Sequence, residues 1–95
     1  MKQKLSENEI FRTSELVLAV TLISFGFHLE TLEKSSSNKA IFIFKKNPSL
    51  DKIVEKFWQR NLKVEPVAFS ESQRYLKSRI YSTGNLNDQQ SSSGV

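Results

Sequence analysis

Hydrophobic residues fall into four groups along this chain, and their spacing differs from group to group. The first group, Leu16 to Phe25, has eight apolar residues in ten, which predicts a helix covered on most of its circumference. Thr13 or Ser14 suits the N-cap of this helix, and Gly26 suits its end because glycine adopts the left-handed conformation most easily. We therefore expect a buried helix at the centre of a domain.

The second and third groups predict two strands joined by the polar residues 34–38. From Phe27 to Thr31 every second residue is polar or charged, as in a strand with one buried face. From Ala40 to Phe44 every residue is apolar, so both faces of that strand need cover. We expect the two strands to pair as an antiparallel β-hairpin, which needs further packing because a lone hairpin is marginal in water.

Two amphipathic helices complete the pattern. Apolar residues recur with helical spacing from Leu50 to Trp58, and Asn47 before them suits an N-cap. A last helix with a thinner apolar edge is expected after the extended connector at residues 62–66 and continues to about Tyr81. The predicted fold is a small αββαα domain of the α+β class.

The two ends of the chain differ from its middle in composition. Residues 1–10 are mainly polar, and residues 83–95 are rich in Gly, Asn, Gln and Ser. This predicts a flexible N-terminal segment, a single domain at residues 11–82 and a disordered polar tail. The apolar run from Leu16 to Phe27 is shorter than the ~20 residues that span a bilayer. No membrane association is therefore expected.

Charge is also uneven along the chain, whose net charge is +4. Residues 1–33 carry three Lys or Arg and five Asp or Glu, whereas residues 34–82 carry eleven and four. A basic half favours an anionic partner, and nucleic acid is the leading hypothesis; the alternative is that lysines only keep a small protein soluble. The expected phosphate contacts are Lys45, Lys46, Arg60, Lys63, Arg74, Lys77 and Arg79.

These cations occur in two kinds of place. Two lysines precede the helix that begins near Pro48, where unpaired amides can hold a phosphate. Pro48 removes one such amide and Asp51 already supplies a carboxylate, so this joint is interpreted as mainly structural. The last helix is the stronger candidate because Tyr75 and Tyr81 are interleaved with its cations and can stack on bases. A solvated amphipathic helix is the alternative.

The residues that most enzymes need are scarce. There is no cysteine, His28 is the single histidine, and the three glycines are scattered, so no metal site or phosphate-binding loop is indicated. We expect a non-enzymatic protein without a cofactor, located in the reducing cytoplasm. The rival function is a protein-interaction module, an accessory subunit or inhibitor, that uses the uncovered edge of the hairpin to bind a protein or a second copy.

Three stretches carry a resemblance to a known family: TSELVLAVTLISFGF, KAIFIF and RYLKSRIY. Over about residues 11–82 the chain resembles a family of short proteins from phage, mobile elements and candidate-phyla bacteria that is catalogued only as a domain of unknown function. The shared pattern is a helix with T-S-E-L, a Gly-Phe turn, an aromatic strand and a basic last helix. The resemblance implies one αββαα domain and transfers no functional site.

Overall fold

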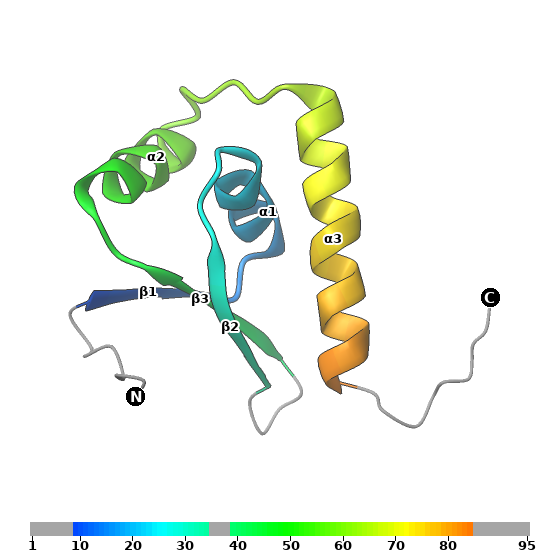
Figure 1. Cartoon of the computed structure of the whole chain (residues 1–95). Helices are drawn as coiled ribbons and strands as arrows, with labels where there is room; N and C mark the ends of the chain where they lie inside the picture. Colours follow the sequence, from blue (N-terminus) through cyan, green and yellow to red (C-terminus); the bar gives the residue numbers. More distant parts are fainter. Residues whose placement is uncertain (1–8, 35–38, 85–95) are drawn as a thin grey trace.

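Three strands and three helices make up the part of the chain that the computed structural model describes, residues 9–34 and 39–84 (Figure 1). In chain order they are β1 (Ile10–Thr13), α1 (Leu16–Ser24), β2 (Leu29–Lys34), β3 (Ala40–Lys45), α2 (Pro48–Trp58) and α3 (Pro66–Gly84). The strands form one antiparallel sheet. This confirms a small α+β domain, and it adds one strand to the predicted order.

The added strand is β1, and it corrects the predicted start of the first helix. Phe11 lies opposite Phe44 of β3, and the Lys46 backbone N–H donates to the Glu9 carbonyl (2.9 Å) at the end of the same ladder. Strand β3 thereby gains a hydrogen-bonding partner on its second edge, as buried backbone groups require. The helix begins only at Leu16, and neither predicted cap residue holds the N-cap position, which Glu15 occupies.

Of the segments predicted to be flexible, residues 1–8 and 85–95 lie outside the described residues, whereas Ile10 belongs to β1 and residues 83–84 belong to α3. Four residues, two of them polar, are too few to produce a periodic signal.

The sheet has the order β1-β3-β2, with β3 in the middle. Both outer strands run antiparallel to β3 and hence parallel to each other, so β1, α1 and β2 form a split βαβ unit around β3. The predicted β2–β3 hairpin is confirmed. Because β1 covers one edge of β3, the open edge of the hairpin is that of β2.

A register shift between Leu29 and Thr31 changes which residues of β2 face the core. Leu29 lies opposite Phe44 and Leu32 lies opposite Phe42, so both leucines share one face of the sheet. Thr31, expected on the buried face, is exposed, whereas Leu32 is buried. The simple alternation predicted for this strand is therefore wrong after Leu29.

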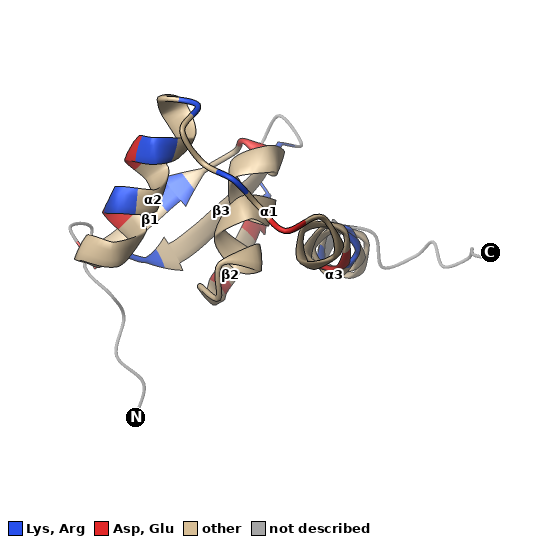
Figure 2. Cartoon of the chain, turned by 90° about the horizontal axis from the view of Figure 1, so that it is seen from above, with Lys and Arg blue, Asp and Glu red and all other residues tan. Residues whose placement is uncertain are grey.

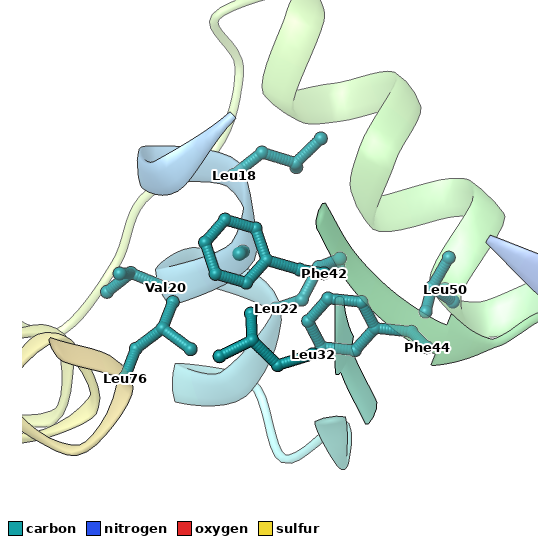
Figure 3. Packing of buried hydrophobic residues seen from close by; sticks show 9 residues of the cluster. Leu18, Val20, Leu22, Leu32, Phe42, Phe44, Leu50 and Leu76 are labelled. Carbon is teal, nitrogen blue, oxygen red and sulfur yellow. The ribbon is translucent and has the colours of Figure 1, made fainter. Parts of the chain in front are cut away.

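Helix α1 lies over one face of the sheet, between α2 and α3 (Figures 1 and 2). Its five consecutive residues Leu18–Leu22 are all buried, which confirms the predicted central helix. The hydroxyl of buried Thr21 donates to the Val17 carbonyl (2.7 Å), so its polar group is satisfied within the helix. Figure 3 shows the core around α1, with Leu18, Val20, Leu22, Leu32, Phe42, Phe44, Leu50 and Leu76.

Helices α1 and α2 end in the same way. In each, the residue after the C-cap has a positive φ, Gly26 (96°) for α1 and Arg60 (63°) for α2. The Phe27 N–H donates to the Leu22 carbonyl, and the Asn61 N–H donates to the Lys56 carbonyl, at 3.0 Å in both cases. This is the Schellman arrangement. The predicted end at glycine is confirmed for α1, whereas in α2 an arginine takes the position that glycine usually fills.

Candidate nucleic-acid interface

Helix α3 carries three of the seven predicted site residues. It begins at Pro66, and the Glu65 carboxylate caps it by accepting from the Val67 N–H (3.1 Å) and the Ala68 N–H (2.7 Å). Its inner edge holds the buried residues Ser72 and Leu76, which are one turn apart. With only this narrow edge packed on the core, most of the surface of α3 faces solvent.

Arg74, Lys77 and Tyr81 form one row on the outer side of α3, because residues three and four apart lie on the same side of a helix. All three side chains are exposed, and Tyr81 is 73% exposed. Within residues 9–34 and 39–84 no carboxylate lies within ion-pair distance of Arg74 or Lys77. Glu71 precedes Arg74 by one turn without pairing with it. We call Arg74 and Lys77 the outer basic pair.

Arg79 lies on a different side of α3, next to Tyr75. The Arg79 Nη1 atom donates to the Tyr75 hydroxyl (2.7 Å), and its guanidinium carbon lies 5.8 Å from the centre of the Tyr75 ring. Unlike the outer basic pair, Arg79 is partly buried. The structure therefore divides the cations of α3 into two groups.

At the joint between β3 and α2, the side chains serve the start of the helix. Asn47 is the N-cap, and its side-chain oxygen accepts from the Leu50 N–H (2.9 Å), as the sequence predicted. Lys46 Nζ lies 2.9 Å from Asp51 Oδ1 in an exposed ion pair. Lys45 is exposed and lies opposite Ile10 at the end of the β1–β3 ladder. These contacts agree with the interpretation of this joint as mainly structural.

Arg60 and Lys63 lie in the connector between α2 and α3, which passes over α1 in the view of Figure 2. Both side chains are exposed. The seven predicted cations thus occupy three places: the β3–α2 joint, this connector and α3. Because α1 separates α2 from α3, the structure does not gather them into one patch (Figures 1 and 2).

Helix α2 adds two cations that were not among the predicted contacts. Lys52 and Lys56 are one turn apart and exposed, with Asp51 and Glu55 next to them in the sequence. Their spacing on the polar side of the predicted helix was the signal that would have identified them. The neighbouring carboxylates lower the positive potential around Lys52 and Lys56. The positive potential around the outer basic pair of α3 is lowered less.

Residues 9–34 and 39–84 also bear on metal binding and on membrane insertion. No group of three or more His, Cys, Asp or Glu side chains is placed to hold a metal ion there. In the same residues, no helix has the length and apolar character needed to cross a membrane.

The fold and its surface define a small α+β domain with a split βαβ core and a basic outer helix. Residues 8–82 match the model of a family described as "Domain of unknown function (DUF5659)", and the chain belongs to this family. This confirms the predicted membership in a family catalogued only as a domain of unknown function. No curated protein and no solved structure gives a significant match.

Proposed function

We propose that this protein is a non-enzymatic, nucleic-acid-associated protein whose phosphate contacts come mainly from the outer basic pair of α3. The observation that carries this proposal is the exposed position of Arg74 and Lys77, one turn apart and without a carboxylate partner in the described part of the chain. Cations on an exposed helix contact phosphate more often than bases, so the interaction we propose is independent of sequence.

The energetic basis is the release of counterions. Nucleic acid carries condensed cations, and each phosphate that a Lys or Arg neutralises sets one free, so affinity falls as salt rises. Segment 34–82 carries a net charge of +7, which also steers an anionic partner toward this half of the molecule. Arg60 and Lys63 in the connector are also exposed and offer further cations at a separate place, before α3 begins. A cytoplasmic location and an origin in phage or mobile elements are part of this proposal.

The protein-interaction alternative is less well supported by the arrangement of the sheet. Strand β1 occupies one edge of β3, so a partner strand would have to add to β2 or β1. The open edge of β2 carries the exposed charges Glu30, Glu33 and Lys34. Charged side chains on an edge strand oppose the addition of another strand. We therefore favour nucleic acid as the partner.

The test is a salt titration of binding to single- and double-stranded oligonucleotides, measured by fluorescence anisotropy. With three or four phosphate contacts, log Kd is expected to change with log salt with a slope of magnitude about 3. The double variant Arg74→Gln with Lys77→Gln loses about two phosphate contacts, so the magnitude of its slope should fall by about 2. Its thermal unfolding midpoint should stay unchanged.

The matched control is Lys52→Gln with Lys56→Gln, which removes the same charge from α2. This control should keep most of the salt dependence. Equal effects of the two double variants would show that only net charge matters. Binding that resists high salt and ignores Arg74 and Lys77 would contradict the proposal.

A further inference from the structure

A hollow of about 380 Å³ opens between the end of α1, the start of β2 and the middle of α3. It is lined by Ile23, Gly26, Phe27, His28, Leu29 and Tyr75. A volume of this size lies within the range of small-ligand pockets. The hollow lies on the Tyr75 side of α3, away from the outer basic pair.

The walls of the hollow are mainly apolar, and several of their residues pack against the core. Ile23, Phe27 and Leu29 are partly buried and pack against the core cluster. Gly26 stands at the end of α1, and a Cβ atom built there would meet nothing within 4 Å. The C-terminal turn of α1 therefore leaves open space where a larger residue would narrow the entrance.

Two aromatic side chains that line this hollow are exposed, and a cation contacts one of them. Tyr75 is 44% exposed and His28 is exposed, so each offers a ring face or edge to an incoming group. The hydrogen bond from Arg79 to the Tyr75 hydroxyl (2.7 Å) restrains both side chains. A guanidinium has five N–H donors, so after this bond Arg79 keeps donors for an anion. The hollow is thus lined by an exposed aromatic ring that is hydrogen-bonded to a neighbouring cation.

We propose that this hollow accepts one unpaired base of a single-stranded nucleic acid, stacked on Tyr75 with the adjoining phosphate at Arg79. The inference rests on the proposed function and adds the kind of strand that the protein prefers. Aromatic rings with cations nearby are the usual platform for unpaired bases. Bases in a duplex are paired and stacked, so they cannot enter a hollow of this kind without being extruded.

The experiment compares two single-stranded 12-mers with the same backbone, oligo(dT) and a version with abasic sites, in anisotropy titrations at one low salt concentration. The intact protein should bind the base-containing strand about 5- to 150-fold more tightly, the range that stacking of one base gives. Tyr75→Ala should remove this difference while the affinity for the abasic strand stays the same. Tyr81→Ala, a tyrosine on the other side of α3, should leave the difference in place.

Three outcomes would overturn the inference, and they differ from failure of the proposed function. The intact protein could bind the two strands equally, or the difference in affinity could be lost in Tyr81→Ala and kept in Tyr75→Ala. Either result would exclude the hollow as the base-binding site and leave phosphate binding intact. Free thymidine monophosphate that binds as tightly as oligo(dT) would indicate a small-molecule site instead. Failure of both strands to bind would reject the proposed function as well. Tyr75→Phe, which keeps the ring, should keep the difference between the two strands. Circular dichroism melts establish that the variants are folded.

Discussion

Helices α1 and α3 contact each other and share one core, but they use their side chains in opposite ways. In α1 five consecutive residues are buried, so every side of the helix in that stretch is packed against something. In α3 the buried residues are Ser72 and Leu76, and the other residues between Pro66 and Ser82 are partly or fully exposed. The first helix has little surface left with which to bind a partner, whereas the second presents charged and aromatic side chains along most of its length.

In a domain of this size, a binding surface is expected on the elements that need the least packing. A chain of about a hundred residues has a thin stability margin and needs at least one fully packed element at its centre. Here α1 takes that role, and it carries no charged residue. Helix α3 needs only one edge for packing, so Arg74, Lys77 and Tyr75 are free to vary for binding without disturbing the core.

Stability should differ most between variants of two aromatic residues, one in each of these two environments. Phe44 lies beneath α1 and is 0% exposed, whereas Tyr81 lies on α3 and is 73% exposed. Phe44→Ala should lower the free energy of unfolding by about 3–5 kcal/mol because it leaves a cavity in the core. Tyr81→Ala should change it by less than about 0.5 kcal/mol. Urea unfolding followed by Trp58 fluorescence measures both. Similar values for the two variants would contradict the packing described.

A second prediction concerns the single edge by which α3 is held. Leu76 is fully buried and contacts the cluster around α1, near Val20 and Leu32 in Figure 3. Leu76→Ala should cost about 2–5 kcal/mol. Because α3 has few other buried contacts, amide exchange in α3 should accelerate before exchange in α1 does. Hydrogen exchange measured by NMR distinguishes the two helices. Equal acceleration in both would mean that α3 does not unfold separately from α1.

Much of this fold could be predicted from local signals. The apolar run of α1, the spacing of α2, the cap at Asn47 and the stop at Gly26 all act within one or two helical turns, so the sequence alone displays them. Strand β1 was missed because its formation depends on the free edge of β3, some thirty residues away. The face of Leu32 was missed because a bulge reverses the alternation, and no residue type in β2 signals it.

The candidate site also has features that local sequence shows and features that depend on the whole fold. Helical spacing alone places Arg74 and Lys77 on one side of α3 and Arg79 with Tyr75 on another. The separation of the seven cations into three places depends on how α2, its connector and α3 are arranged around α1, which is a property of the whole fold. The hollow near Tyr75 needs α1, β2 and α3 together, so no stretch of sequence could have indicated it.

The smallest effects concern the ends of α1 and α2, where one motif is made with two different residues. At Gly26 a positive φ is easily adopted, and no atom lies within 4 Å of an added Cβ. Gly26→Ala should therefore cost only the backbone strain of a left-handed residue, about 1–2 kcal/mol. At Arg60 the native residue already bears this strain, so Arg60→Gly should relieve it. The gain is reduced by the greater freedom of glycine in the unfolded chain and by loss of a cation at a helix C-terminus.

The net result for Arg60→Gly should be a stabilisation between a few tenths and about 1 kcal/mol, opposite in sign to the effect at Gly26. Urea unfolding of the two single variants measures the contrast, with Arg60→Asn as the control that removes the charge but tolerates the left-handed conformation. If the charge of Arg60 serves to contact a phosphate, the glycine variant should be more stable and should lose up to one phosphate contact. The magnitude of its salt slope should then fall by up to about 1. A loss of stability larger than about 1 kcal/mol would instead show that the arginine side chain holds the connector in place, and the strain at this position would then have a structural cause.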